Sequence, residues 1–383
     1  MKGRMQKIST LSDNCLQNDR TESEGTVGVQ TFIGITENHL VEVQFTKDDL
    51  LERILSADNM NRAYKQVVSN SGSGGVDKMA TKDLLPYLKL HKDELTNSLM
   101  DGRYLPHPFR RVEIPKDGGK KRQLGIPTVV DRFIQQSISQ VLIPLYERQF
   151  SDNSFGFRPK RSAHHALQRA QSYISDGYEY CVDLDLEKFF DTVNHSKLIE
   201  ILSCTVKDGR VISLIHKYLL SGVMAGTRYE EQEQGVVQGG PLSPLLSNIM
   251  LHELDKELES RGYKFVRYAD DCMIFCRSKR SALRVKHTIT TFIEEELFLQ
   301  VNDEKTSVGH VGGMKFPGYS FYIKNGECRF CVHSRSYLKL KTRLKELTGR
   351  SNGMGYAKRK ENLHLFIRGW IGMPSALLVQ ELI

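Results

Sequence analysis

The chain of 383 residues has no run of about 18 or more apolar residues, the length that a membrane-spanning helix requires. Its N-terminus also lacks the apolar segment of a secretory signal, so the sequence predicts neither a membrane span nor export. The cysteines are odd in number and scattered, unlike a disulfide framework, and they occupy positions 15, 181, 204, 272, 276, 328 and 331. We therefore expect a protein of the reducing cytoplasm.

Cys328 and Cys331 have the C-x-x-C spacing of many zinc sites, and His333 follows them. A structural zinc ion needs four ligands, however, and the sequence has no second pair at a suitable distance. We therefore interpret both cysteines as half-buried residues of a strand rather than as metal ligands.

Positive charge is in excess, and it is concentrated near the C-terminus. The formal net charge of the whole chain is +8. Residues 334–368 contain ten Lys or Arg and two Glu, and ten minus two gives the same +8, so the remainder is close to neutral. Leu340, Leu344 and Leu347 give this segment an apolar helical stripe opposite its basic face. The pattern predicts a helix that grips a polyanion such as nucleic acid, with an ordinary solvated helix as the alternative.

The order of predicted elements indicates an α+β fold. Hydrophobic residues make up 39% of the chain and charged residues 26%, as in ordinary soluble domains, and the length allows two or three of them. A polar, irregular lead-in over residues 1–40 is followed by helices predicted at 50–70, 82–101, 130–149, 194–206, 243–262 and 281–299. Strands are predicted as hairpins at 109–127 and around residue 270, and singly at 178–186 and 300–308. This order favours helices packed behind an antiparallel sheet.

Adjacent carboxylates interrupt the apolar segment VRYADDCMIF, residues 266–275. Asp270 and Asp271 fall at the tip of the predicted hairpin, where two like charges repel unless a cation compensates them. VDLDLEKFFDTV, residues 182–193, offers Asp183 and Asp185, which share one face of a strand. We expect this strand to neighbour the hairpin, so that the acids meet. A solvated hairpin tip is the plain alternative.

Carboxylates from two neighbouring strands suit hard divalent cations. Mg²⁺ prefers oxygen ligands and typically takes one or two carboxylates together with substrate phosphates. Two such ions about 4 Å apart stabilise the attacking and leaving oxygens of an in-line phosphoryl displacement. Between the acidic segments lies QGGPLSPLLSNI, residues 238–249, whose glycines let the backbone approach a ligand closely. Gln238 adds hydrogen bonds without charge. A purely structural turn is the alternative there.

Several sequence blocks together resemble the reverse transcriptases encoded by bacterial group II introns. The blocks are FVRYADD, QGGPLSPLLSNIML, VDLDLEKFFDTVNH, FSDNSFGFRP, and RRVEIPK followed by LGIPTVVDRFIQQ. They occur in the family's order and spacing from about Leu50 to Trp370, most of the chain. The resemblance implies a right-hand polymerase fold with fingers, a palm of antiparallel sheet backed by helices, and a partial helical thumb.

The same resemblance implies domain boundaries. Residues 1–45 would be a poorly ordered lead-in, and residues 46–177 an N-terminal extension with the fingers. Residues 178–325 would form the palm, with fingers helices partly interleaved. Residues 326–383 would be a partial basic thumb, and the chain would be C-terminally truncated, since it departs from the family pattern after FIRGW (366–370) and carries no maturase domain. Val237 and Pro317 also depart from the family, which usually has proline and leucine there.

Site residues are carried over position by position. Asp185, Asp270 and Asp271 resemble the palm acids: the first two would be the main ligands of two Mg²⁺ ions, and Asp271 would give weaker support. Asp183 competes with Asp185, but the family spacing favours Asp185. Phe189 and Phe190 resemble the aromatic position under the incoming sugar, whose ring would exclude a 2′-hydroxyl. The choice between them stays open, with a slight preference for Phe190.

Further residues would bind substrates. The nucleotide would be bound by Lys116 and Arg122 of the fingers hairpin, by Gln238 and Gly239, and by Lys305, which would act as a general acid for pyrophosphate. Template or duplex would be contacted by Arg158 and by the basic residues Arg335, Lys339 and Arg343. The implied partners are an RNA template, a DNA primer, deoxynucleoside triphosphates and group II intron RNA.

The resemblance predicts an RNA-directed DNA polymerase that copies RNA into DNA by two-metal nucleotidyl transfer. A second hypothesis is an intron RNA-binding or splicing protein whose polymerase activity is impaired by loss of the thumb and maturase region. A retron-like relative is a third and weaker reading, which the long blocks of group II type argue against.

Overall fold

The computed structural model describes residues 49–115, 121–324, 327–349 and 353–372, and the backbone of residues 29–36 and 39–46. The helices are α1 Leu50–Ile54, α2 Ala57–Asn70, α3 Leu84–Met100, α4 Val129–Glu147, α5 Ala163–Ser175, α6 Phe189–Thr192, α7 His195–Thr205, α8 Gly209–Leu219, α9 Ser243–Ser260, α10 Lys279–Glu295, α11 Ser334–Thr348 and α12 Tyr356–Gly372. The strands are β1 Val29–Thr36, β2 His39–Thr46, β3 Phe109–Pro115, β4 Lys121–Ile126, β5 Tyr180–Leu184, β6 Val223–Ala225, β7 Arg228–Glu230, β8 Lys264–Tyr268, β9 Asp271–Cys276, β10 Ser307–His310, β11 Tyr319–Lys324 and β12 Glu327–Val332. In the described part of the chain, no helix has the length and apolar character needed to cross a membrane.

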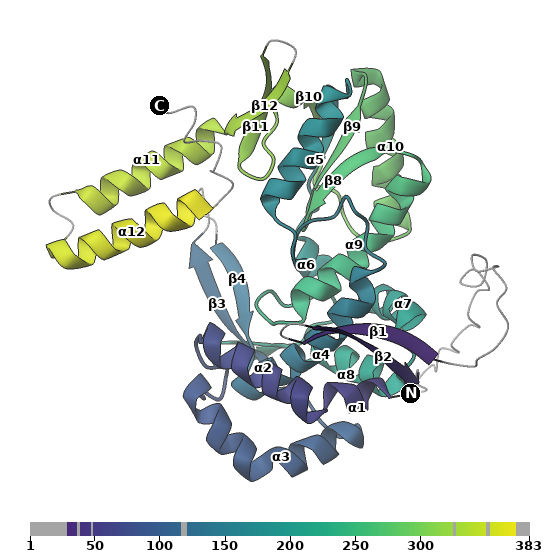
Figure 1. The fold of residues 1–383 in the computed structure, drawn as a ribbon, viewed down its shortest axis with the longest axis vertical. Coiled ribbons are helices and arrows are strands. Elements are labelled where there is room, and N and C mark those ends of the chain that lie inside the picture. Colours follow the sequence, from purple (N-terminus) through teal and green to yellow (C-terminus); the bar gives the residue numbers. More distant parts are fainter. Residues whose placement is uncertain are drawn as a thin grey trace.

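A four-stranded antiparallel sheet forms the centre of the upper half of the molecule (Figure 1). Its strand order is β10-β5-β9-β8, so the strand that precedes Asp185 lies beside the strand that begins at Asp271. This adjacency confirms the neighbouring strands expected from the sequence, and the mixture of helices with antiparallel sheets confirms the α+β class.

Both faces of this sheet are buried, in two separate cores. Val182 and Leu184 of β5 enter a core shared with α9 and α10, whereas Cys181 enters a core shared with α5, β11 and β12. Because successive strand residues point to opposite faces, near-continuous apolar runs in β5 and β9 cover both sides. The acids at the strand ends are therefore attached to a rigid support.

A second sheet carries the predicted hairpin. β3 and β4 pair antiparallel, as predicted for residues 109–127, and β6 and β7 extend them to the order β4-β3-β6-β7. The turn residues 116–120 lie outside the described residues. Figure 1 shows the hairpin rising from the helical lower half, which contains α1 to α4, towards α11 and α12.

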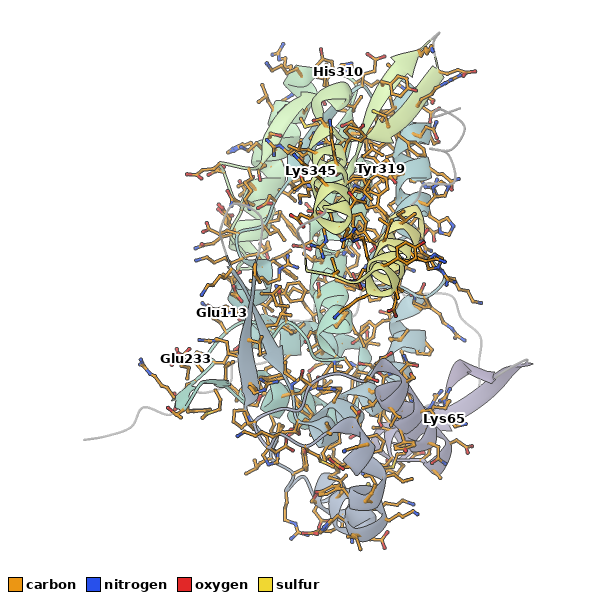
Figure 2. All side chains as sticks on the ribbon, turned by 90° about the vertical axis from the view of Figure 1, so that its left-hand side faces the viewer. Lys65, Glu113, Glu233, His310, Tyr319 and Lys345 are labelled. Carbon is orange, nitrogen blue, oxygen red and sulfur yellow. The ribbon has the colours of Figure 1, made fainter. Side chains whose placement is uncertain are left out.

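The C-terminal helices α11 and α12 project from one side of the molecule (Figure 1). In Figure 2, which looks onto that side, Lys345 of α11 lies above Glu113 of the hairpin. Leu347 is buried and Leu340 and Leu344 are half-buried, which confirms the apolar stripe predicted for the basic segment. The basic side chains of α11 remain exposed.

Three sequence expectations need correction. The helix predicted over 50–70 is divided into α1 and α2, with Ser56 in an extended conformation at the start of α2. The strand predicted over 300–308 is restricted to Ser307–His310, because residues 302–306 form a turn that bonds to Asp185 instead. Residues 29–36 and 39–46 pair as strands, within a stretch expected to be a poorly ordered lead-in.

A buried carboxylate, Asp131 of α4, joins three parts of the lower half. It accepts hydrogen bonds from the hydroxyls of Tyr104 (2.6 Å), Thr128 (2.6 Å) and Tyr218 (3.2 Å). The Nδ1 atom of His107 lies 3.4 Å from the same carboxylate. Each buried oxygen therefore has partners, as a buried charge requires.

This contact predicts a pH-dependent stability. The hydrogen bond to Asp131 is the largest cause that raises the pKa of His107 above its usual 6.5. A raised folded pKa contributes stability that is fully present below the unfolded pKa and lost as pH rises through the folded pKa. We expect the melting temperature of His107→Gln to fall less than that of the wild type as pH rises through this window. Parallel curves in thermal unfolding from pH 5 to pH 9 would contradict the assignment.

Candidate active site

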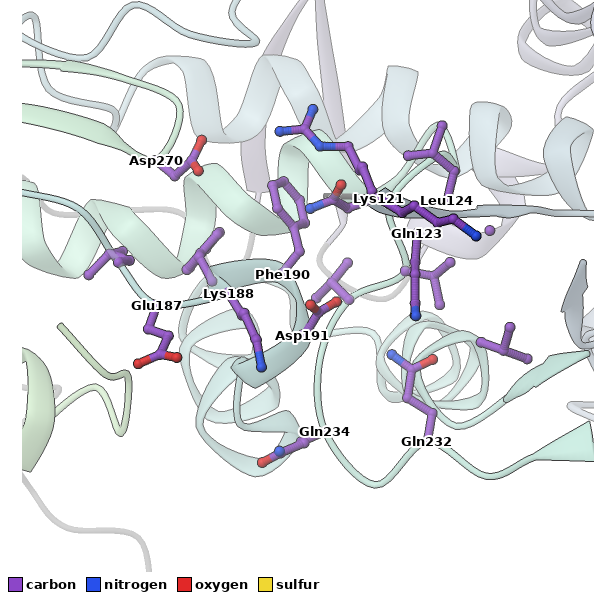
Figure 3. A pocket seen from close by; sticks show the side chains of 18 of the residues that line it. Lys121, Gln123, Leu124, Glu187, Lys188, Phe190, Asp191, Gln232, Gln234 and Asp270 are labelled. Atoms are coloured by element: carbon purple, nitrogen blue, oxygen red, sulfur yellow. The ribbon is translucent and has the colours of Figure 1, made fainter. Parts of the chain in front are cut away.

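A cavity of about 810 Å³ lies between the β3–β4 hairpin and the ends of β5 and β9. Its lining includes Arg122, Asp185, Phe190, Asp270 and Lys305, which come from well-separated parts of the sequence. Figure 3 shows Asp270 and Phe190 on one side of the cavity, and Lys121, Gln123 and Leu124 of the hairpin on the other. The fold thus brings most of the residues predicted for nucleotide chemistry to one place.

The acidic turn is a tight hairpin between β8 and β9. Tyr268 pairs with Asp271, so only Ala269 and Asp270 connect the two strands. Ala269 has a φ of 58°, a left-handed conformation that is unfavourable for a residue with a Cβ atom. Asp270 and Asp271 are both exposed, and Asp270 lines the cavity. Strained backbone of this kind is frequent at functional sites.

The acids of the neighbouring strand lie close enough to interact with this turn. β5 pairs with β9 through Asp183 with Met273 and Leu184 with Cys272, and Asp185 directly follows the last pair. Burial, followed by the negative charges of Asp271 and Asp185, raises the pKa of Asp183 to about 6. Negative charge therefore converges at the strand ends, where it favours a bound cation.

The turn of residues 302–306 holds Asp185 in place. The backbone N–H of Asn302 donates to the carbonyl of Asp185 (2.9 Å), and the N–H of Asp185 donates to the hydroxyl of Thr306 (3.1 Å). The same turn carries Lys305, whose Nζ atom lies 2.9 Å from Oδ1 of Asp185. The sequence predicted Lys305 near the nucleotide but did not predict an ion pair with a metal-ligand candidate.

The donor chemistry at this place suits Mg²⁺. Within the described ranges, no group of three or more His, Cys, Asp or Glu residues is arranged to hold a metal ion. Mg²⁺ nevertheless takes only one or two carboxylates from many proteins and completes its shell with water and substrate phosphates. Asp185 and Asp270 line the same cavity, and the Lys305 ammonium already stands as a cation beside Asp185. The residues present therefore fit the implied ion.

Phe189 and Phe190 start α6 and differ in exposure. Phe189 is 3% exposed and belongs to the core, whereas Phe190 is half-buried. The two rings meet edge to face, with centroids 5.2 Å apart. Figure 3 shows the ring of Phe190 pointing into the cavity. This difference favours Phe190 for a contact with a bound molecule.

The loop that contains Gln238 packs directly on the hairpin. The N–H of Gly125 in β4 donates to the carbonyl of Gln238 (2.8 Å), and the side chain of Gln238 lines the cavity. Gly239 has a φ of +124°, and a Cβ atom there would lie 2.5 Å from the carbonyl oxygen of Gly125. Glycine is required at this position for both reasons.

The sequence is similar to a known family of proteins. The family described as reverse transcriptase (RNA-dependent DNA polymerase) matches residues 114–321. Protein YkfC of Escherichia coli K12 is 31% identical over 324 residues, covering 73% of this chain and 85% of that protein. The chain belongs to the reverse transcriptase family.

Named relatives indicate the branch of reverse transcriptases. Group II intron-encoded protein LtrA of Lactococcus lactis is 31% identical over 353 residues, covering 74% of this chain. The putative COX1/OXI3 intron 2 protein of Saccharomyces cerevisiae is 29% identical over 334 residues, covering 70% of this chain. The chain spans 58% of the length of LtrA and 38% of the yeast protein. These matches support a group II intron reverse transcriptase with the α+β fold of that family.

Not every predicted substrate contact of the reverse transcriptase is accessible. The side chain of Arg158 is 1% exposed and donates to Glu147 (2.8 Å) and to the carbonyls of Ser151 (2.5 Å) and Ser154 (2.8 Å). The direct nucleic-acid contact predicted for Arg158 is therefore wrong, because its guanidinium is used to fold the loop of residues 151–158.

The basic residues of the reverse transcriptase fall into two groups. Arg122 of the hairpin is exposed and lines the cavity, while Lys116 lies outside the described residues. Arg335, Lys339 and Arg343 are exposed on α11. Sequence reasoning missed Arg111 and Lys121, which also line the cavity and form ion pairs with Glu230 (2.6 Å) and Glu113 (2.5 Å). The signal in the sequence was their position in the consecutive basic runs Arg110–Arg111 and Lys120–Arg122.

Proposed function

We propose that this reverse transcriptase extends a DNA primer along an RNA template, using deoxynucleoside triphosphates in the cavity described above. The observation that carries the proposal is that one cavity is lined by Asp185, which follows β5, by Asp270, in the turn before the neighbouring strand β9, and by Arg122. The oxygen of the primer 3′-hydroxyl bonds to the α-phosphorus and gives up its proton to water, while the bond from the α-phosphorus to the oxygen bridging to the β-phosphate breaks and pyrophosphate leaves. Acids on one wall and a guanidinium on the other match the charges of that reaction.

Each acid has a proposed role. Asp185 and Asp270 would be the main ligands of two Mg²⁺ ions, with Asp271 in weaker support; such ions supply charge stabilisation at the attacking and leaving oxygens. Asp183, the competing choice, lies one residue inside the end of β5 and is largely buried. Lys305 would protonate the leaving pyrophosphate once its ammonium separates from Asp185, from which it lies 2.9 Å away in the structure.

The opposite wall would hold the nucleotide. Arg122, together with Lys116, would bind the triphosphate, since a planar guanidinium suits phosphate oxygens. Gln238 and Gly239 would line the nucleotide and template side. The N-terminal extension and the fingers would then comprise residues 46–177. The palm would comprise residues 178–325, and the partial thumb residues 326–383. Arg335, Lys339 and Arg343 would contact the phosphates of the RNA–DNA duplex, which is recognised mainly by shape and backbone.

Phe190 would select deoxynucleotides by occupying the space of a 2′-hydroxyl. Replacing it with valine should raise the ratio of kcat/KM for ribonucleotides to that for deoxynucleotides by at least about tenfold, the usual scale for one steric contact in a pocket. The measurement is single-nucleotide extension with each triphosphate. The matched control is Phe189→Val, whose ring also borders the cavity but is 3% exposed and belongs to the core; equal relaxation by both variants would contradict the choice of Phe190.

Group II intron RNA is the partner that we propose, because relatives of this chain are named for group II introns. We also propose a cytoplasmic setting, because the scattered cysteines suit a reducing compartment.

The deciding experiment is primer extension by the purified chain on an RNA template annealed to a DNA primer, with Mg²⁺. We expect elongated products that require all three components. Salt-dependent RNA binding without any extension would overturn the proposal in favour of a protein that only binds RNA.

A further inference from the structure

A fully buried ion pair lies beneath the acidic turn. Arg267, near the end of β8, and Asp255 of α9 both have side chains that are 0% exposed. The guanidinium of Arg267 donates twice to the carboxylate of Asp255, at 2.7 Å from Nε and 2.5 Å from Nη2. This is the bidentate geometry of a strong charge-assisted pair.

The remaining nitrogen of Arg267 reaches the turn itself. Its Nη1 atom donates to the carbonyl of Ala269 (2.9 Å) and to Oδ1 of Asn248 (3.1 Å). The carbonyl of Ala269 belongs to the peptide that links it to Asp270. One side chain therefore connects α9 to the peptide immediately before an acid of the proposed active site.

The other side of the turn is packed by the loop of residues 153–156. The N–H of Arg267 donates to the carbonyl of Asn153 (2.8 Å), and the N–H of Phe155 donates to the carbonyl of Arg267 (2.9 Å). Asn248 closes the arrangement by donating to the carbonyl of Gly156 (2.9 Å). A Cβ atom on Gly156 would lie 2.2 Å from the backbone nitrogen of Ala269, so the loop and the turn are in direct contact.

Stability alone does not account for this arrangement. Burying two charges costs desolvation, and well-packed apolar residues are often at least as stabilising as a buried ion pair. An apolar pair would, however, provide no donor for the carbonyl of Ala269. The left-handed φ of 58° at Ala269 is costly and persists only where the surroundings fix it.

We propose that Arg267 is a positioning residue that holds the Ala269–Asp270 peptide, so that the Asp270 carboxylate keeps its orientation in the cavity. Asn248 orients the Nη1 end of Arg267, and Asp255 neutralises and anchors the guanidinium. This inference rests on the proposed function, since Asp270 is the acid that it orients.

The test variant is Arg267→Lys, with Tyr218→Phe as the matched control. Lysine keeps the charge, but its single ammonium cannot replace the planar fork that bonds Asp255, Asn248 and Ala269 together. Tyr218→Phe also removes a buried hydrogen bond to a carboxylate, Asp131, away from the cavity. We expect Arg267→Lys to lower kcat by about 100-fold, the scale of a misplacement near 1 Å, with little change in nucleotide KM. The control should keep the wild-type kcat.

Hydrogen exchange in the free protein provides a readout that is independent of activity. Amides of peptides covering residues 266–275 should exchange at least about tenfold faster in Arg267→Lys, and those of α10 should not change. Adding Ala269→Gly to the lysine variant should recover part of kcat, because glycine adopts a positive φ without strain. A wild-type kcat in the folded lysine variant, or a loss no larger than that of Tyr218→Phe, would overturn the inference.

A second variant and the activity of the wild type separate a folding defect from a loss of positioning. If Arg267→Lys does not fold, Asn248→Ala takes its place, since it removes one partner of Nη1 and leaves the ion pair intact; unchanged kcat and exchange in that variant would equally overturn the inference. Absence of extension by the wild type would count against the proposed function. Faster exchange at the turn in the variants would still support the positioning role.

Discussion

Replacing Asp270 by asparagine is expected to reduce RNA-templated primer extension by at least about 1000-fold. The substitution keeps the size of the side chain and removes the negative charge that faces the cavity from the acidic turn. Charge stabilisation by metal ions is worth several kcal/mol in the transition state, and each ~1.4 kcal/mol is a factor of ten in rate. The measurement is single-turnover extension of a labelled primer at saturating Mg²⁺.

Binding provides the internal check for this experiment. Affinity for the template–primer duplex should stay close to that of the wild type, because the exposed basic residues on α11 are unchanged. Asp176→Asn, at the exposed end of α5, is the matched control and should extend normally. Extension by Asp270→Asn within about tenfold of the wild type would remove Asp270 from the proposed metal ligands.

Lys305→Gln should lower two quantities, the rate of extension and the Mg²⁺ concentration that extension requires. The rate of extension should fall by about 100-fold, because a positioned general acid contributes at least that much. The Mg²⁺ concentration that gives half-maximal extension should also fall, since the ammonium 2.9 Å from Asp185 no longer competes with the ion. A titration of rate against Mg²⁺ measures both.

The control for this lysine is Lys256→Gln, which breaks an exposed ion pair with Glu253 on α9. Neither the rate nor the Mg²⁺ dependence of that variant should change. A lower rate for Lys305→Gln with an unchanged Mg²⁺ requirement would support the general acid and contradict the competition at Asp185. An unchanged rate would contradict the general acid.

The elements that sequence predicted best have strong local patterns. The neighbouring position of β5 and β9 follows from their apolar runs and the hairpin around residue 270, so the sequence could predict that Asp185 and Asp270 line one cavity. The hairpin at 109–127 and the helix at 243–262 were equally clear. Of the predicted nucleotide-binding residues, Phe189, Phe190 and Gln238 line the cavity, and their contacts with a nucleotide stay predictions.

The features that the sequence did not predict are those that depend on tertiary contacts. Arg158 is a basic residue in a loop motif, and only the structure reveals that Glu147 and two carbonyls enclose it. The sequence around residues 302–306 is typical of a strand. These residues nevertheless form a turn, because the backbone N–H of Asn302 bonds to the carbonyl of Asp185. β6 is too short for a periodic signal and exists because it pairs with β3. Arg267 likewise lies within an apolar strand, with no local sign of its partner in α9.

The hydrogen bond between Gly125 and Gln238 has a consequence for motion in the polymerase cycle. The two backbones approach so closely that a Cβ atom on Gly239 would lie 2.5 Å from the carbonyl oxygen of Gly125. If β4 moves on nucleotide binding, the loop with Gln238 has to move with it or this hydrogen bond has to break. The strand that precedes the proposed triphosphate contacts and the loop proposed to line the template side therefore share one backbone hydrogen bond.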